Sequence, residues 1–168
     1  KNIGMGAGNN IGLKKCKTEY AYVLNPDTKL NKDTLTNLYK GLTEVSDFSL
    51  ATPLNDDQKI PNYKILTNSN KYNDVLSVDR IDGFSMFFNL KKFNNKIFFD
   101  EKFFLYLEND DLCLRLKKKG EFIYVIKNSL INHKGGISKN NNLEYLRNWH
   151  WMWSKFYFNK KNYGIFFC

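Results

Sequence analysis

The sequence predicts an α/β fold in which helices flank a mostly parallel sheet. Short apolar runs rich in aromatic and β-branched residues, each bounded by turn formers, indicate strands. Stretches with apolar residues at helical spacing lie between them. Because such strands and helices alternate along the chain, a largely parallel sheet is expected. The 168 residues suit one domain, and 42% hydrophobic residues are too many for a disordered chain.

The predicted strands are short, and turn residues separate them. They cover residues 19–24 (EYAYVL), 47–54, 75–81, 84–90 and 122–126. The polar stretch 55–74 is expected to form a loop.

Two amphipathic helices and a helical tail are predicted. The first covers residues 32–44, with Asn31 as its N-cap. The second covers residues 108–119, and Gly120 ends it. Residues 1–138 are assigned to the main domain, and residues 139–168 to an aromatic and basic helical tail.

Charge and cysteine content exclude several classes of protein. The net charge is +9, yet only three of the 26 basic residues are Arg, the side chain that recognises phosphates and bases best. A nucleic-acid partner is therefore not expected. Three cysteines without metal-site spacing argue against a disulfide framework and a zinc site, and they indicate a reducing, cytoplasmic setting.

The first twelve residues contain four glycines. Glycines let a backbone approach a ligand closely, and N–H groups at a helix start often hold phosphates. A tight turn explains the same glycines.

Asn25-Pro26-Asp27 follows a predicted strand. Ligands of open α/β sheets bind beyond the carboxyl ends of strands, where a carboxylate can hold a divalent cation. An ordinary turn is the alternative.

Glu108, Asp110 and Asp111 follow an aromatic run. Crowded carboxylates beside bulky side chains raise a pKa, as a general base requires. Stabilisation of a helix N-terminus by acidic residues is the alternative. His133, which precedes two glycines, is either a ligand or an ordinary buried or surface histidine.

Taken in order, these segments resemble the family 2 glycosyltransferases, and in particular their rhamnosyltransferase-like branch. The resemblance runs from Asn2 to about Ser138, and it rests on NxGxGxGNNxG, EYAYVLNPD, DGFSMF, FDEKFFLYLENDDLC and INHKGGIS. It implies a GT-A fold, an inverting transfer from a nucleotide-diphosphate sugar, and a divalent metal, Mn²⁺ or Mg²⁺.

The resemblance also implies roles for individual residues. Asp27 matches the metal-binding aspartate of the family, with Asn25 beside it, and His133 matches a histidine that completes metal or diphosphate binding. Donor-binding positions fall on Asn2, Gly4, Gly8, Asn9, Asn10, Asn25, Asp82 and Gly83.

The acidic motif departs from the family pattern, because Asn109 stands where the family places its catalytic base. Asp110 or Asp111 is then expected to be the base, with Glu108 third. A degenerate, non-catalytic binding module is the alternative. The family's first nucleotide-binding strands would precede Asn2, so an incomplete domain is expected.

The implied partners are a UDP- or dTDP-linked sugar and a saccharide or lipid-linked acceptor, in the synthesis of bacterial surface polysaccharide. The tail carries Trp149, Trp151 and Trp153 among lysines, which is typical of a membrane interface. Core closure or a partner subunit is the other explanation. The expected location is therefore cytoplasmic, at the inner face of the cell membrane.

Overall fold

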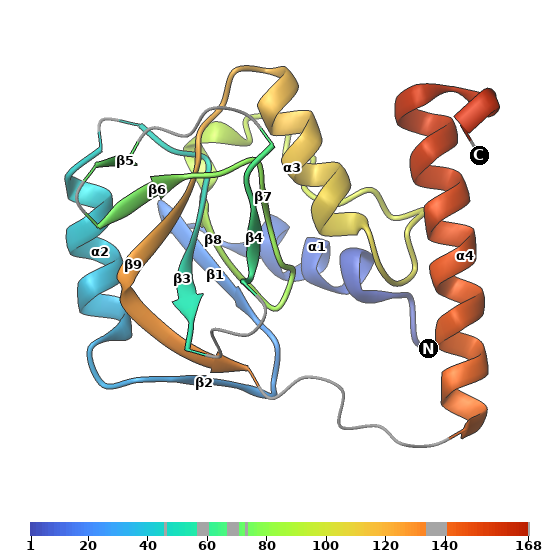
Figure 1. Ribbon diagram of the computed structural model, residues 1–168, viewed down its shortest axis with the longest axis horizontal. Coiled ribbons are helices and arrows are strands. Elements are labelled where there is room, and N and C mark those ends of the chain that lie inside the picture. The colour runs from blue at the N-terminus through green and yellow to red at the C-terminus, as the bar shows by residue number, and fades with distance from the viewer. Residues whose placement is uncertain (46, 57–60, 67–70, 73, 134–140, 168) are drawn as a thin grey trace.

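The computed structural model describes residues 1–45, 47–56, 61–66, 71–72, 74–133 and 141–167 (Figure 1). Its elements, in chain order, are α1 (Met5–Lys15), β1 (Tyr20–Leu24), β2 (Thr28–Leu30), α2 (Thr34–Thr43), β3 (Leu50–Asn55), β4 (Tyr63–Lys64), β5 (Lys71–Tyr72), β6 (Val75–Ser77), β7 (Arg80–Ile81), β8 (Ser85–Asn89), η1 (Leu90–Lys92), α3 (Glu108–Lys118), β9 (Ile123–His133), α4 (Asn141–Tyr163) and η2 (Ile165–Phe167).

The α/β class is confirmed, but the prediction of a mostly parallel sheet is wrong. The main sheet has the order β1-β8-β3-β9-β6-β5, with β2 also paired to β9, and among the described strands its only parallel pair is β3 with β9. Strands β1, β3 and β9 do run in one direction, as the alternation of strands and helices predicts. However, β8 inserts between β1 and β3 in the opposite direction, and β6 runs antiparallel to β9. Because β6 and β8 both run opposite to β3 and β9, antiparallel pairings outnumber the parallel one, and the pairings of β8 with β3 and of β6 with β9 join strands that are not consecutive in the chain.

Helices cover both faces of this sheet. On one face Leu38 and Leu42 of α2 pack with Ala51, Tyr124 and Ile126 of the sheet. Apolar side chains of α1 and α3 pack on the other face, against alternate residues of the same strands, namely Leu13, Leu112 and Leu116 against Leu50, Phe88 and Val125. The alternation explains why the central strands contain almost continuous apolar sequence.

The strand β9 is much longer than the range 122–126 that the sequence predicts. The polar residues Lys127, Asn128 and Ser129 interrupt its apolar pattern, at the place where the register against β3 shifts between Pro53 and Leu54. Beyond this irregularity β9 continues to His133 and pairs with β2. The strand therefore carries His133 to the end of the sheet where β1 also ends.

The last helix, α4, packs on the segment 98–107 and not on the sheet (Figure 1). Ser154 donates a hydrogen bond to the Leu105 carbonyl over 2.7 Å, and the Tyr157 hydroxyl donates to Asp100 over 2.9 Å. The Phe103 ring meets Tyr157 edge-on, with centroids 4.8 Å apart. In the part of the chain that the structure describes, no helix is both long and apolar enough to cross a membrane.

Candidate functional site

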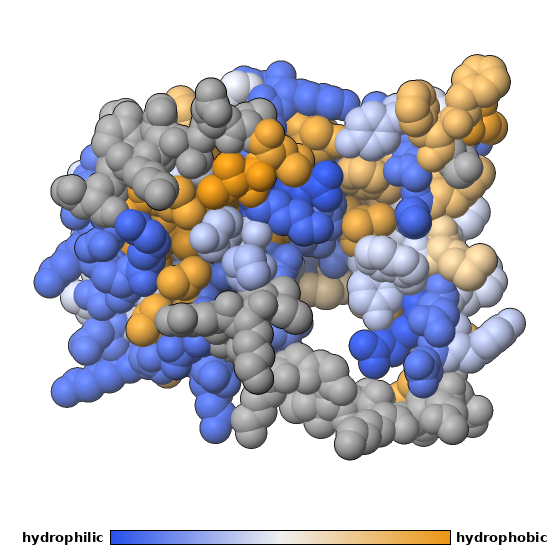
Figure 2. Space-filling view, in the orientation of Figure 1, coloured by the Kyte–Doolittle hydropathy of each residue, from blue (hydrophilic) through white to orange (hydrophobic). Residues whose placement is uncertain are grey.

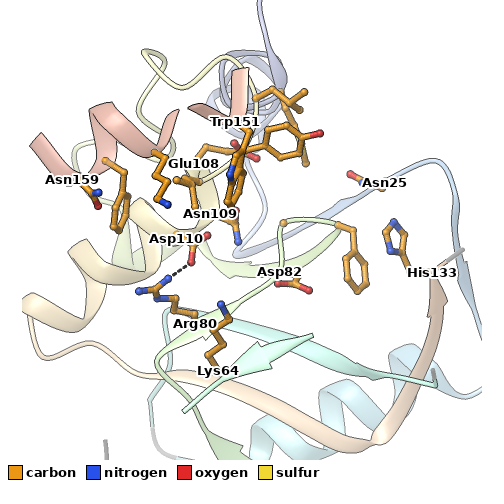
Figure 3. A pocket seen from close by; sticks show the side chains of 18 of the residues that line it. Asn25, Lys64, Arg80, Asp82, Glu108, Asn109, Asp110, His133, Trp151 and Asn159 are labelled. Carbon is orange, nitrogen blue, oxygen red and sulfur yellow. Dashed lines mark hydrogen bonds and ion pairs between the residues drawn. The ribbon is translucent and has the colours of Figure 1, made fainter. Parts of the chain in front are cut away.

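A cleft of about 710 Å³ lies between the end of the sheet, the N-terminus of α3 and one side of α4 (Figure 3). It gathers residues from segments far apart in the sequence. The polar and charged residues of its lining are Asn25, Lys64, Arg80, Asp82, Glu108, Asn109, Asp110, His133, Lys155 and Asn159. Six of the residues singled out from the sequence therefore share one cleft: Asn25, Asp82, Gly83, Glu108, Asp110 and His133.

Asn25 and His133 stand at one end of the cleft, where β1 and β9 finish. His133 stacks on Phe84, with ring centroids 3.9 Å apart and planes at 5°. Its Nε2 lies 3.3 Å from the Asp27 carboxylate, and the two side chains are only 18% and 33% exposed. The stacking holds the imidazole in place, so that its polar edge faces Asp27. This end joins a carboxylate and an imidazole that lie more than 100 residues apart in sequence.

Arg80 and Asp110 form an ion pair of 2.7 Å across the other end of the cleft, between β7 and α3 (Figure 3). Asp82 follows β7, and in this view its side chain lies between the ion pair and His133. Partial burial by the cleft walls, together with the negative charge of Asp110, raises the pKa of the Asp82 carboxyl above its ordinary value. The ion pair leaves Asp110 neutralised by Arg80, while Asp82 accepts no side-chain hydrogen bond among those the structure describes.

Asn109 is used structurally. Its side-chain amide donates to the Ile81 carbonyl over 2.9 Å. Its Cβ lies next to Gly83, and a Cβ added at Gly83 would be 3.4 Å from it. Asn109 therefore ties the start of α3 to the turn that carries Asp82.

Glu108, the first residue of α3, is almost completely buried at 3% exposure. Burial raises the pKa of its carboxyl, and Asp110 contributes in the same direction. One of its carboxylate oxygens has no hydrogen-bond partner among the described residues.

Asp111 lies away from the cleft. Its side chain is fully buried between Arg115 Nε, 2.8 Å away, and Lys161 Nζ, 2.7 Å away. It is absent from the cleft lining that the structure describes. The geometry therefore gives Asp111 a role in joining α3 to α4, and its catalytic role stays a prediction.

The glycine-rich start of the chain is mostly helix. Gly4, at φ 93°, lies so close to the Phe104 backbone that a Cβ would come within 2.6 Å of its carbonyl oxygen. Asn2 accepts a hydrogen bond from the Gly4 N–H, and buried Asn10 makes three hydrogen bonds to the segment 99–101. Of this segment, the described cleft lining includes only Met5. Donor binding by Asn2, Gly4, Gly8, Asn9 and Asn10 stays a prediction.

Several residues that line the cleft were not predicted as site residues. Lys64 lies in β4, within the stretch expected to be a loop, and Arg80 lies in β7, within the strand predicted over residues 75–81. Trp151, which was predicted to face a membrane interface, comes from α4 together with Lys155 and Asn159. The spacing 151, 155 and 159 places one side chain per helical turn on the same side, so helical periodicity within the tail was the available signal.

A strained turn at Tyr106 and Leu107 forms the part of the cleft wall just before α3. Tyr106 and Leu107 have positive φ values of 71° and 64°, which side chains other than glycine rarely adopt. Both residues line the cleft, and Leu107 is the N-cap residue of α3. Such strain costs on the order of 1 kcal/mol per residue and tends to occur at functional sites.

The residues present fit a divalent cation in part. Asp27 and His133 approach each other as two ligands would, but no group of three or more His, Cys, Asp or Glu side chains meets within the described ranges. Mn²⁺ and Mg²⁺ bound with a nucleotide commonly take few protein ligands and complete their shell with phosphate oxygens and water. The pair therefore suits a cation that arrives with a phosphorylated substrate.

Comparison with known proteins finds a distant similarity. The chain is 25% identical over 137 residues to the low-salt glycan biosynthesis hexosyltransferase Agl10 of Haloferax volcanii, a match that covers 70% of this chain and 44% of that protein. The chain thus spans less than half of the length of this curated relative. No model of a known protein family matches the sequence.

Proposed function

We propose that this protein is a glycosyltransferase, or the part of one that carries its catalytic cleft, and that it moves a hexosyl group onto a growing glycan. The observation that carries the proposal is the convergence of Asn25, Asp82, Asp110 and His133 in one cleft from four separate segments. The similarity to a glycan biosynthesis hexosyltransferase supports the same reaction class. The finer proposal is an inverting family 2 enzyme of the rhamnosyltransferase-like branch.

The donor in this proposal is a UDP- or dTDP-linked sugar, and its diphosphate lies at the end of the cleft that His133 lines, with Asp27 beside His133. A divalent cation, Mn²⁺ or Mg²⁺, would be held by these two residues and would offset the charge of the departing diphosphate. Asn25 and Gly83 line the space beside them and would contact the sugar. The acceptor, a saccharide or a lipid-linked saccharide, would enter along the wall formed by Trp151, because sugar rings pack well on aromatic faces.

The acceptor hydroxyl must lose a proton as it attacks the anomeric carbon, and the cleft offers three carboxylates for this task. Asp110 is held by Arg80, and Glu108 is almost wholly buried. Asp82 faces the cleft, and its raised pKa makes it a stronger base than an ordinary aspartate. We therefore assign the proton to Asp82, next to the Asn109 that occupies the family's base position. Asp110 and Arg80 position the turn that carries Asp82.

Asn109 also favours a second candidate, a degenerate module that binds a nucleotide sugar without turnover. An amide cannot accept a proton usefully, and here its side chain is used to hold the Ile81 carbonyl. The two candidates share the binding end of the cleft and differ in whether product forms.

The test is transfer of labelled hexose from a panel of UDP- and dTDP-hexoses to saccharide and lipid-linked acceptors, with Mn²⁺ present. Asp27→Ala should abolish metal-dependent transfer. The matched control is Asp33→Ala, which removes an exposed acid that makes no side-chain cap at the start of α2. Equal transfer by wild type and Asp27→Ala would contradict the proposed site, whereas binding without product from any donor would favour the degenerate module.

A further inference from the structure

The outward side of α4 carries an apolar stripe that no other described element covers. At helical spacing the stripe contains six large apolar side chains that are each 39–73% exposed, which we call the aromatic face: Tyr145, Leu146, Trp149, Met152, Trp153 and Phe156. The opposite side of the helix is already used, since Ser154 and Phe158 are buried against the rest of the protein. A helix that is apolar on both sides is normally covered on both sides.

Aromatic rings dominate this face and form a continuous surface. Trp149 and Trp153 stack with centroids 6.5 Å apart, and Trp153 contacts Phe156 at 5.9 Å. Figure 2 shows pale and orange side chains gathered along α4 and at its C-terminal end. There Ile165, Phe166 and Phe167 of η2 add further exposed apolar surface. Exposed apolar area of this extent marks an interaction site and not an ordinary solvated surface.

The charges around the aromatic face are positive. A shallow pocket of about 600 Å³ has a floor of Trp153, Phe156 and Tyr157 and a rim of three lysines, Lys102, Lys160 and Lys161. Lys161 is paired with Asp100 and Asp111, so the positive charge of the rim comes from Lys102 and Lys160. Lys160 Nζ lies 5.9 Å from the Phe156 ring centre, and Lys102 Nζ lies 5.8 Å from that of Tyr157. Glu144 is the only acid in the sequence of α4, and helical spacing places it off the stripe. The complementary surface is therefore apolar and negatively charged.

From these observations we infer that the aromatic face of α4 docks on the surface of an anionic lipid bilayer. Trp and Tyr prefer the membrane interface, because their rings can lie among acyl chains while their N–H and O–H groups reach the headgroups. Lysines at the rim meet anionic headgroups. A second copy of the chain would present the same lysines and no acid from α4, so a symmetric contact lacks charge complementarity.

The membrane docking does not depend on the proposed glycosyl transfer. It does have a geometric consequence for the cleft. Trp151, Lys155 and Asn159 of α4 line the cleft on the side of the helix next to the aromatic face. An α4 lying on a bilayer would therefore place the cleft wall close to the headgroups.

The test is cosedimentation of the full chain with vesicles, together with intrinsic fluorescence. One set of vesicles contains phosphatidylcholine alone, and the other contains phosphatidylcholine and phosphatidylglycerol in equal parts. All three tryptophans of the sequence lie on α4, so the emission reports directly on this helix. We expect binding to the anionic vesicles, a blue shift of the emission, and weaker binding as salt is added.

The variants distinguish membrane binding through the aromatic face from non-specific adsorption through any exposed apolar side chain. Trp149→Ala with Trp153→Ala should weaken binding about tenfold or more, since affinity scales with buried apolar area. Lys160→Gln should weaken it about fivefold, which corresponds to one lysine near an anionic surface. Phe122→Ala is the matched control, because Phe122 is 44% exposed, as Trp153 is at 43%, but precedes β9 at the sheet. Circular dichroism confirms that each variant is folded.

Four outcomes would overturn the inference. The first is wild-type protein that stays in the supernatant with anionic vesicles. The second is equal binding to neutral vesicles, and the third is an equal loss of binding in Phe122→Ala. The fourth is a concentration-dependent dimer that the double Trp variant dissociates in the absence of lipid binding, which would assign the face to a second copy.

Discussion

At the level of single residues, the acidic side chains around the cleft differ in what surrounds them, and this difference separates their roles. Asp110 is paired with Arg80, and Asp111 is buried between Arg115 and Lys161. Asp82 combines a raised pKa with a place facing the cleft, whereas Glu108, whose pKa is also raised, is almost completely buried. The pair of Asp27 and His133 marks the opposite end.

Asp82→Asn tests the role of Asp82 through both activity and stability. Since the folded state raises the pKa of Asp82, its ionised form opposes folding at neutral pH, and this penalty disappears as the pH falls below the ordinary aspartate value of about 3.9. The variant should therefore unfold at higher urea concentration than wild type near pH 7 and at an equal concentration near pH 3. Transfer should fall by about 100-fold or more if Asp82 is the base.

The control for this prediction is Asp33→Asn, at an exposed acid outside the cleft. A loss of stability at pH 7 in Asp82→Asn, or full transfer by that variant, would contradict the role given to Asp82.

At the level of elements, the position of α4 depends on a small polar cluster. Lys161 donates to Asp100 and lies 2.7 Å from buried Asp111, while Tyr157 also donates to Asp100. Although burial opposes ionisation of Asp100, the bonds from Lys161, the Lys102 backbone and Tyr157 lower its pKa. Stability from Asp100 is thus present above the ordinary pKa and is lost as the pH falls through the lowered value.

Lys161→Ala should lower the free energy of unfolding by about 2 kcal/mol, because it leaves Asp111 buried with one partner instead of two. The adjacent Lys160→Ala is a matched control, since Lys160 points outward and contacts only the Phe156 ring in the described contacts; it should change stability by less than about 0.5 kcal/mol. Urea unfolding followed by tryptophan fluorescence reports on α4 directly. Similar losses in the two variants would show that the cluster does not hold this helix.

Two glycines in helices should respond to alanine in opposite ways. A Cβ at Gly41 of α2 would come within 2.6 Å of Ile126 Cγ2, which belongs to a fully buried side chain of β9. Gly41→Ala should therefore destabilise the protein by about 1–3 kcal/mol. A Cβ at Gly12 of α1 meets nothing within 4 Å, so Gly12→Ala should stabilise by up to about 1 kcal/mol through helix propensity. Thermal melts of the two variants should move apart, and a shift in the same direction would contradict the packing of α2 on β9.

At the level of the whole molecule, the sequence predicted most elements but not how the strands run. Apolar runs and turn residues located β1, α2, β3, α3 and α4 well, because local periodicity follows from local structure. The reversal of β8 between β1 and β3 is a choice between distant pairings, and no local pattern records it. For the same reason β9 was predicted too short, since its pairing with β2 carries it through the polar residues 127–129.

The candidate site also combines residues that local motifs singled out with residues whose placement depends on distant packing. Turn-forming and acidic motifs singled out Asn25, Asp82, Glu108, Asp110 and His133, which line the cleft, and Asp27, which lies beside His133; their functional roles stay predictions. The sequence did not reveal that Asp111, adjacent to Asp110, faces the protein interior, because the direction of a side chain in the first turn of α3 depends on the packing of α4. Lys64 was missed because β4 is too short for a recognisable pattern. Arg80 falls in the strand predicted over residues 75–81, but no local pattern records its pairing with Asp110.

The most direct test of the whole account is a thermal melt of the protein with Mn²⁺ and UDP together, and separately with Mn²⁺ and dTDP, for wild type and Asp27→Ala. A ligand at about 100 times its dissociation constant adds about 2.7 kcal/mol, which raises the melting temperature of a domain of this size by about 5–10 °C. The account predicts such a shift for wild type with one nucleotide, only when metal is also present, and its loss in Asp27→Ala. Two results would contradict the claim that this cleft binds a nucleotide-diphosphate sugar. One is a wild-type melting temperature that does not change with metal and either nucleotide, and the other is an equal shift of the melting temperature in Asp27→Ala.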